Sequence, residues 1–366
     1  MPAQVDLAIV GSGLAAAAAA AVAARLGAQV VLLVRRGLVH GFGEVIDPRG
    51  LLALDRMGLR GRVSSALGAS VDRMHLRWPP ERDWVRTVPG PGTIASATRL
   101  TETLRECAAA AGAWIVETDG TMAGSSLRAC HRSWDLCVPS GGSSIAVDWV
   151  VDATGKGDWA QAHGLERQSV YRHMAVHVVG HRTGASGREP ASMLVSASAD
   201  GWCYRLVYPG PQIAGAVFRR EGALKPGQVQ ALASGLMRME GGVACAALSA
   251  RVVRCELAFA RRCDGPGWIA IGGAAVELDP LSGQGMGWAL ESAWQGVQAC
   301  LQETEPASRL VRYREIWAGR VRMAHQAAAR HHGEAVKAFG TPYWLESLEK
   351  VRGAVLPPSV PAISIT

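Results

Sequence analysis

Residues 5–34 read VDLAIVGSGLAAAAAAAVAARLGAQVVLLV, and this stretch decides the fold of the chain. The apolar run at 5–10 is typical of a buried parallel strand, and the alanine-rich run that ends near Leu26 favours a helix. A second apolar run at 29–34 completes a stretch of about thirty residues, the length of a βαβ unit. Between the first strand and the helix lies GSGLAA, residues 11–16, which fits the GxGxxA pattern of a dinucleotide-binding turn.

The small residues of this turn each have a physical role. Gly11 permits a tight turn, Gly13 lets backbone amides approach a pyrophosphate, and Ala16 keeps the helix close to the strand. The N-terminus of the helix then directs its partial positive charge at the phosphates. We therefore expect Gly11, Gly13, Leu14, Ala15 and Ala16 to contact a dinucleotide.

The end of the second strand departs from the dinucleotide-binding pattern. An Asp or Glu at that place binds the adenosine ribose hydroxyls, whereas this chain has Val34, followed by Arg35 and Arg36. We expect these two arginines to lie over adenine or to contact a phosphate, and we expect the usual ribose hydrogen bond to be missing.

The composition excludes several classes of protein. The 366 residues are 49% apolar and 19% charged, which excludes a disordered chain. The net charge of +7 is mild and no run of Lys or Arg exceeds two residues, so we expect no nucleic-acid partner. The sequence has no uninterrupted apolar span and no signal-peptide pattern, so we expect no membrane association and a cytoplasmic location. Its eight cysteines show neither CxxC nor zinc spacing, so we expect no metal site.

Three later segments connect the N-terminal turn with a known family. They are WVVDATG at 149–155, GWIAIGGAA at 267–275 and DPLSGQGM at 279–286. In this order, the four segments resemble the FAD-binding elements of the para-hydroxybenzoate-hydroxylase-like flavoprotein superfamily, over nearly the whole chain to about Cys300. Pro280, Gly283 and Gly285 match the PxxGxG of that superfamily, whose turn directs backbone N–H groups and a helix N-terminus at the flavin.

The resemblance implies an α/β fold with a Rossmann-like FAD-binding domain that is discontinuous in sequence. A mostly antiparallel substrate-binding sheet is inserted into it, and helices follow at the C-terminus. We expect the FAD-binding domain at 1–75, 95–165 and 255–305, and the substrate domain at 76–94 and 166–254. The C-terminal helical segment and tail are expected at 306–366.

The turn and the resemblance together give a set of residues expected to bind FAD: Gly11, Gly13, Leu14, Ala15, Ala16, Arg35, Arg36, Arg99, Gly155, Gly272, Gly273, Pro280, Gly283, Gln284, Gly285 and Met286. Gly273 stands where the superfamily has the Asp of a GD pair, so a second acid is missing besides the one at Val34. Three interpretations stay open: weak FAD binding, transient uptake of reduced FAD, or a relative without flavin.

Two shorter matches indicate a branch of the superfamily. GEVIDP at 43–48 resembles the GE-x-x-x-P segment of flavin-dependent tryptophan halogenases and quinone-cofactor maturases, and Arg99 resembles the arginine that the family places near the flavin. DPLSGQG is most similar to the maturases, which hydroxylate peptidyl tryptophan, and to the tryptophan hydroxylases that act on carrier peptides.

The distribution of lysine argues against halogenation. By resemblance, a halogenase lysine is expected near residues 71–76, but the chain has no Lys from Met1 to Gly155. The halogenase WxWxIP segment is matched only loosely by residues 202–209. We therefore expect a monooxygenase that hydroxylates an electron-rich ring through a flavin C4a-hydroperoxide, with a peptidyl or carrier-bound tryptophan or another indole as substrate. The alternatives are a flavin oxidase or dehydrogenase and a non-catalytic flavoprotein-fold partner. The absence of a second GxGxxG favours a separate flavin reductase.

Four residues in or beside the flavin motifs are candidates for the base that accepts a substrate proton: Glu44, Asp47, His75 and Asp279. Three of them also have a structural interpretation. His75 is equally consistent with a hydrogen-bonded core residue, Glu44 with a group that orients flavin or backbone, and Asp279 with a cap of the turn at Pro280.

The substrate sheet has its own pattern. Residues 173–179 favour a strand with His173 and His177 on one face, and residues 202–208 and 213–218 favour a hairpin. Trp202, Tyr204 and Tyr208 share a face, which is consistent with an aromatic pocket or with ordinary packing. Residues 306–339 favour a basic amphipathic helix, which is either a solvated face or a docking surface for an acidic carrier peptide.

Overall fold

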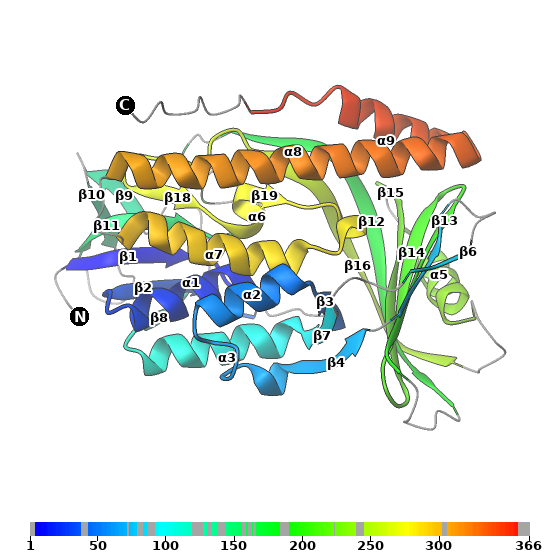
Figure 1. The fold of residues 1–366 in the computed structure, drawn as a ribbon, viewed down its shortest axis with the longest axis horizontal. Coiled ribbons are helices and arrows are strands. Elements are labelled where there is room, and N and C mark those ends of the chain that lie inside the picture. The colour runs from blue at the N-terminus through cyan, green and yellow to red at the C-terminus, as the bar shows by residue number, and fades with distance from the viewer. Residues whose placement is uncertain are drawn as a thin grey trace.

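The computed structural model describes residues 4–37, 43–71, 73–78, 83–86, 92–118, 127–130, 133–137, 144–155, 159, 163, 166–183, 190–222, 224–238, 245–301 and 306–357. Two large sheets lie side by side, with helices over both, and a small sheet lies between them at one edge (Figure 1). Among the described residues, no helix combines the length and the apolar character that crossing a membrane requires.

The first sheet is the dinucleotide-binding unit that residues 5–34 predict. Its strands are β1 (Gln4–Val10), β2 (Val30–Arg35), β8 (Trp114–Thr118), β9 (Leu127–Cys130), β10 (Ser133–Cys137), β11 (Ser144–Asp152), β17 (Asp264–Gly265) and β18 (Trp268–Ala270). The central order β18-β11-β1-β2-β8 is parallel throughout. The motif strand at 149–152 therefore lies beside β1, the one at 268–270 lies next to it on the far side, and the carboxyl ends of the three strands meet at the same edge.

Four helices pack on this sheet: α1 (Leu14–Arg25), α3 (Ala97–Ala110), α6 (Gly272–Ala275) and α7 (Gly285–Leu301). Helix α1 is buried from Ala15 to Ala24. Its alanine surface lets neighbouring helices approach closely, because a methyl group needs little space between two backbones. The alanine run therefore builds the centre of the molecule.

The second sheet is mostly antiparallel, as expected. Its strands are β5 (Arg73–Arg77), β6 (Asp83–Arg86), β12 (Arg167–Arg182), β13 (Ser192–Ser198), β14 (Gly201–Val207), β15 (Gln212–Arg220), β16 (Cys245–Ala260) and β19 (Val276–Glu277). Strands β14 and β15 form the expected hairpin, and only the pair β5/β13 is parallel in this part of the structure. The expected boundary between 75 and 76 falls inside β5, and the one between 254 and 255 falls inside β16.

The two faces of this sheet have different neighbours. On one face, Ala175, Trp202 and Phe218 pack against the helices α8 (Pro306–Phe339) and α9 (Pro342–Arg352). On the other face, Val176 and Cys203 pack against α5 (Pro226–Arg238). The long helix at 306–339, which the sequence predicted with these bounds, runs along the first sheet and reaches the second (Figure 1).

The remaining elements connect the two sheets. Strands β3 (Gly43–Ile46), β4 (Leu67–Val71) and β7 (Gly92–Ser96) form the small sheet, with α2 (Pro48–Arg56), η1 (Ser64–Ala66) and η2 (Pro280–Ser282) around it. This sheet lies near the second sheet in Figure 1. Val71 and Ile94 of the small sheet share a buried cluster with Leu206 of β14.

Tryptophan is more frequent than phenylalanine in this chain and supplies several of the largest buried side chains. The chain has 12 Trp against 4 Phe, and Trp159, Trp288 and Trp344 are among its largest fully buried side chains. Trp202 stacks on Phe218 with ring centroids 3.8 Å apart. The tryptophan excess therefore has a packing role.

A buried arginine ties the two large sheets together. Arg167 of β12 donates from Nη1 to the carbonyl oxygens of Gly155 (2.6 Å) and Gly273 (2.9 Å). Its Nη2 forms ion pairs with Glu277 at 2.6 Å and Glu256 at 3.3 Å. The side chain is only 7% exposed, so its contacts are shielded from water.

We expect Arg167→Met to lower the free energy of unfolding by about 3 kcal/mol or more, because breaking a buried ion pair leaves an uncompensated charge. The control is Arg261→Met, whose pair with Glu166 is exposed and should contribute less than about 1 kcal/mol. Urea unfolding measures both variants, and equal effects would contradict this role of Arg167.

Candidate functional site

The turn after β1 forms the first wall of the candidate site. Gly11 has φ +152°, and a Cβ at this residue would lie 2.3 Å from the carbonyl oxygen of Ala153. Only glycine lets the end of β1 lie this close to the turn after β11. Gly13 is the N-cap of α1, and no described atom outside its neighbours lies within 4 Å of where its Cβ would be. The N-terminus of α1 is therefore held in place and open.

The third motif segment packs directly on this turn. A Cβ on Gly272 would lie 2.7 Å from the Cβ of Ala15, and one on Gly273 would lie 3.2 Å from the Cα of Gly155. Gly272 is fixed further, because its N–H donates to Ser292 Oγ and its carbonyl accepts from Trp288 Nε1. The close contact at Gly273 gives a physical reason for the missing acid, because a side chain there would fit only if Gly155 moved by a few tenths of an ångström.

The turn at 280–285 forms the second wall. Gly283 has φ +62° and ends η2, and α7 begins at Gly285. No described atom outside the turn lies within 4 Å of a Cβ placed on Gly283 or Gly285. Gln284 is held by Arg320 of α8, whose Nη1 donates to Gln284 Oε1 at 2.8 Å. The site therefore has two open helix N-termini, those of α1 and α7.

The other predicted residues of these two turns are buried or half-buried. Met286 is buried in the first turn of α7, and Leu14 is half-buried in the first turn of α1. Ala15 and Ala16 are buried in α1, and Pro280 is half-buried at the start of η2.

Cationic side chains gather beside the first turn. The Arg35 N–H donates to Ser12 Oγ at 2.7 Å, and the Arg36 side chain forms an exposed pair with Glu117 at 3.1 Å. Arg105 of α3 donates to the Ser12 carbonyl oxygen, and burial lowers the pKa of its guanidinium. Arg99 is exposed in the first turn of α3. The sequence singled out Arg99 and missed Arg105, which lies less than two turns later in the same predicted helix.

Glu44 is the candidate base with the most perturbed carboxyl group. It lies in β3, and burial raises the pKa of its carboxyl to about 7. Burial, and then the negative charge of Glu44, raises the pKa of Tyr208 to about 12, and the same causes raise the pKa of Tyr204. The structure therefore brings Glu44 together with two of the three aromatic residues expected to share a face. Trp202 lies further along that face, in the cluster beneath α8 and α9.

The contacts of Asp47 indicate a structural role. It caps α2, where its Oδ1 accepts from the Gly50 N–H at 3.1 Å, and burial raises the pKa of its carboxyl. Its Oδ1 also occupies the space that a Cβ on Gly287 would need. The carboxylate is thus wedged between α2 and the first turn of α7.

His75 lies apart from Glu44. It pairs with Leu194 of β13, and its neighbours Met74 and Leu76 belong to the cluster beneath α8 and α9. Because side chains alternate along a strand, His75 faces the other side of the sheet. The structure therefore does not bring His75 to the other three candidates.

Asp279 is the centre of a buried polar cluster. Its Oδ1 caps η2 by accepting from the Leu281 N–H, and its Oδ2 accepts from the Tyr171 hydroxyl at 2.5 Å. His332 Nε2 of α8 lies 3.6 Å from the same oxygen. Burial alone would raise the pKa of Asp279, but the contacts with His332 and Tyr171 outweigh it and hold this pKa at about 2.

This cluster continues to His173 of β12, which receives a hydrogen bond from Tyr343 of α9. His177, four residues along the same strand, packs its ring against Phe218 instead. Tyr171, His332 and Tyr343 are residues that the sequence did not single out, because they come from three separate elements. Within the described ranges, no three His, Cys, Asp or Glu side chains are grouped so that they could hold a metal ion.

No family model matches the chain, and no curated protein matches it. Solved structures do. The peptidyl tryptophan dihydroxylase QhpG, essential for tryptophylquinone cofactor biogenesis, is 20% identical with a TM-score of 0.67, over 94% of this chain and 79% of that chain. The flavin-dependent halogenase CmlS is 20% identical with a TM-score of 0.76, over 94% of this chain and 67% of that chain. A flavoprotein/dehydrogenase from Cytophaga hutchinsonii is 16% identical with a TM-score of 0.72, over 95% of this chain and 92% of that chain.

At these identities the likeness establishes the fold. It confirms the predicted Rossmann-like α/β architecture with an inserted antiparallel sheet. These neighbours are also of the kind that the sequence resemblance predicted.

Glu44 should make the stability of the protein depend on pH. Its carboxyl has a pKa of about 7 in the folded chain against 4.5 for the ordinary group, so the folded state holds a proton that the unfolded state releases. Stability should therefore fall as the pH rises from about 4.5 to about 7, because the buried carboxylate must ionise.

Glu44→Gln should remove this loss. The melting temperature of the variant minus that of the unaltered protein should therefore increase between about pH 5 and about pH 8. Thermal unfolding at several pH values measures it, with Glu315→Gln on the exposed face of α8 as the control. Parallel pH profiles for Glu44→Gln and the unaltered protein would contradict the buried state of this carboxyl.

Proposed function

We propose that the chain is an FAD-dependent monooxygenase that hydroxylates an electron-rich aromatic ring, with a peptidyl or carrier-bound tryptophan as the first candidate substrate. The observation that carries the proposal is the pair of open helix N-termini, α1 at Gly13 and α7 at Gly285, held together by glycine contacts. Helix N-termini of this kind present backbone N–H groups to anionic and polar parts of a ligand.

The residues present fit FAD. Outside their own neighbours, no described atom lies within 4 Å of a Cβ placed on Gly13, Gly155, Gly283 or Gly285, which leaves room for a ligand at each of these turns. The pyrophosphate would be held at α1 and the polar edge of the flavin at α7, with Arg35, Arg36 and Arg105 beside the adenosine end. The missing acids at Val34 and Gly273 favour weak binding or uptake of reduced FAD.

The residues around Glu44 are suited to hold the substrate. When bound and reduced, FAD supplies the electrons with which molecular oxygen becomes able to transfer an oxygen atom to a ring. Tyr204 and Tyr208 give the aromatic surroundings in which an indole would pack. Glu44, with a pKa of about 7, is suited to accept the proton of an indole N–H and to return it.

The choice of hydroxylation over halogenation is supported by the missing lysine and by one relative. The first 155 residues contain no Lys, so the segment at 71–76 itself carries no ammonium group. QhpG, which shares the fold, is a peptidyl tryptophan dihydroxylase. A separate flavin reductase remains the proposed source of electrons.

Gly13→Val should weaken FAD binding by about tenfold or more without lowering the melting temperature by more than a few degrees. The added Cβ enters the space at the N-terminus of α1, where no described atom outside its neighbours lies within 4 Å, and the side chain displaces a phosphate. Fluorescence titration with FAD measures the change. Gly61→Val, at an exposed glycine whose Cβ position is also open, is the control, and unchanged affinity in Gly13→Val would contradict the proposed pyrophosphate site.

The reaction itself is tested with reduced FAD, ¹⁸O₂, bromide and three substrates: free tryptophan, a tryptophan-containing peptide and indole. We expect a product with one ¹⁸O atom from at least one of them, and slower turnover in Glu44→Gln. Brominated product would indicate a halogenase, and hydrogen peroxide with unlabelled oxidised product would indicate an oxidase. Unaltered substrates in every arm would overturn the proposal.

A further inference from the structure

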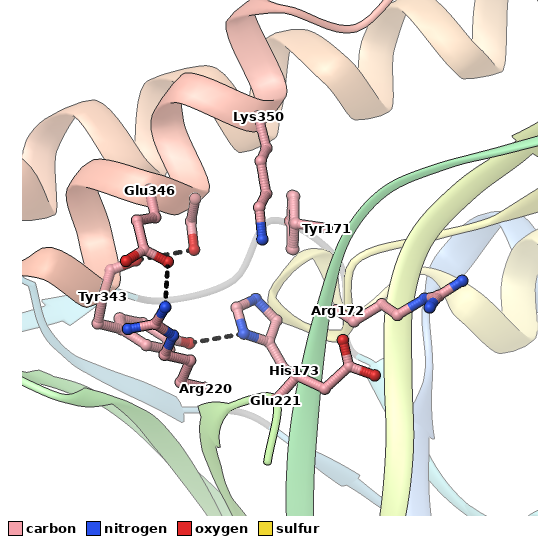
Figure 2. Close-up of a pocket in the computed structure, with 9 residues that line it drawn as sticks. Tyr171, Arg172, His173, Arg220, Glu221, Tyr343, Glu346 and Lys350 are labelled. Atoms are coloured by element: carbon pink, nitrogen blue, oxygen red, sulfur yellow. Dashed lines mark hydrogen bonds and ion pairs between the residues drawn. The ribbon is translucent and has the colours of Figure 1, made fainter.

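A polar pocket of about 210 Å³ lies apart from Glu44, between β12, the end of β15 and α9. His173 of β12 lies in its floor with Lys350 of α9 above it, Tyr171 of β12 lies beside the end of Lys350, and Tyr343 and Glu346 of α9 line the opposite side (Figure 2). Its volume suits one functional group of a ligand rather than a whole ring system, since sites for entire drug-sized ligands are about 300 Å³ or larger.

The floor of this pocket holds an unpaired hydrogen-bonding group. His173 is only 1% exposed, and its Nδ1 lies 3.0 Å from the Tyr343 hydroxyl. Its Nε2 has no hydrogen-bond partner among the described residues, and Figure 2 shows this nitrogen directed at the space below Lys350. A buried polar atom without a partner in a cavity indicates a ligand or an ordered water molecule.

The Tyr343 hydroxyl determines what Nε2 can do. Burial raises the pKa of Tyr343 and lowers the pKa of His173 to about 4, so near neutral pH the phenol keeps its proton and the imidazole is neutral. Among the described residues, the phenol has no other acceptor, so it donates to Nδ1 and the imidazole proton resides on Nε2. His173 therefore presents one N–H donor to the pocket.

Among the described charged side chains around the pocket, all but one lysine form ion pairs. Arg220 pairs with Glu346 at 2.9 Å, Glu221 with Arg254 at 3.3 Å, and Arg172 with Glu256 at 3.1 Å. Within the described residues, Lys350 has no acidic partner, and Figure 2 shows its ammonium group pointing down toward His173. The pocket thus combines the neutral donor of His173 with the positive donor of Lys350, while its two lining carboxylates, Glu221 and Glu346, are each paired with an arginine.

We infer that this pocket binds the carboxylate group of a ligand, with one oxygen accepting from His173 Nε2 and the other from the ammonium group of Lys350. A carboxylate matches two donors on opposite sides of a small cavity, and a hydrogen bond to Lys350 is charge-assisted. Most lysine side chains on a protein surface are fully hydrated. The ammonium group of Lys350 lies over the Nε2–H of His173, and because both groups are donors they cannot form a hydrogen bond with each other.

The location gives the pocket its place in the proposed reaction. Tyr171 separates it from Asp279, which caps the turn that leads into Gly283 and Gly285. A ligand whose carboxylate occupies the pocket is therefore anchored next to the flavin-binding turn. As the anchor of a substrate the inference rests on the proposed function, whereas the carboxylate site itself stands independently of it.

The test compares indole-3-propionate with indole-3-propionamide, which has the same shape without the charge, by isothermal titration calorimetry on the full chain. We expect the acid to bind about tenfold more tightly than the amide, the factor for one charge-assisted hydrogen bond. Lys350→Met keeps the length of the side chain and should bring the two affinities within about threefold of each other. Lys337→Met, on an exposed position of α8, is the control and should leave the ratio unchanged.

A second readout follows His173 directly. In long-range ¹H–¹⁵N spectra of the imidazole rings, the acid should shift the Nε2–H signal of a buried neutral histidine, and the amide should shift it less. Equal affinities for acid and amide, or no saturable binding of either, would overturn the inference. So would binding of inorganic phosphate but not of the acid.

The two proposals fail separately. Preference for the acid without any ¹⁸O-labelled product would leave the carboxylate site standing and contradict the proposed function. ¹⁸O-labelled product together with equal binding of acid and amide would support the proposed function and contradict the carboxylate site.

Discussion

The structure depends on glycines at which neighbouring segments approach so closely that little or no room is left for a side chain. Gly11 lies against the carbonyl of Ala153, Gly272 against the Cβ of Ala15, and Gly273 against Gly155. Each contact joins one motif segment to another, so the three together set the relative positions of β1, β11, α1 and α6, and the hydrogen bonds of Gly272 with Ser292 and Trp288 add α7. Arg167 then holds the carbonyl oxygens of Gly155 and Gly273 from the second sheet. Two helix N-termini are left open as a consequence of how the chain packs.

Two buried carboxyl groups in this molecule have opposite properties, and their surroundings explain the difference. Glu44 is half-buried near two tyrosines, and desolvation raises its pKa to about 7 with no cation among the described residues to offset it. Asp279 is more deeply buried but contacts His332 and Tyr171, so its pKa falls to about 2. Pairs of carboxyl groups that are shifted in opposite directions divide into one that can exchange a proton and one that stays charged. In this chain, Glu44 is suited to proton transfer and Asp279 to holding the turn and the polar cluster in place.

Local sequence pattern predicted those parts of the fold that short segments determine. The βαβ unit, the hairpin of β14 and β15 and the helix at 306–339 follow from period and turn residues, and the structure contains all three. The pairing of β5 with β13 joins residues more than a hundred positions apart, so no local pattern could indicate it, and for the same reason the face of His75 was not predictable. The cluster of Tyr171, His332 and Tyr343 is assembled from three elements and was missed. The sequence did show that an acid is absent at Gly273, and the contact with Gly155 supplies the physical reason.

The most direct test of the glycine-built cradle is a crystal structure of the protein grown with FAD. We predict density for the pyrophosphate at the backbone N–H groups that begin α1, next to Gly13, and density for the polar edge of the flavin at Gly283 and Gly285. FAD bound anywhere else, or a cradle empty of FAD at saturating concentration, would contradict the assignment of these two helix N-termini to the cofactor.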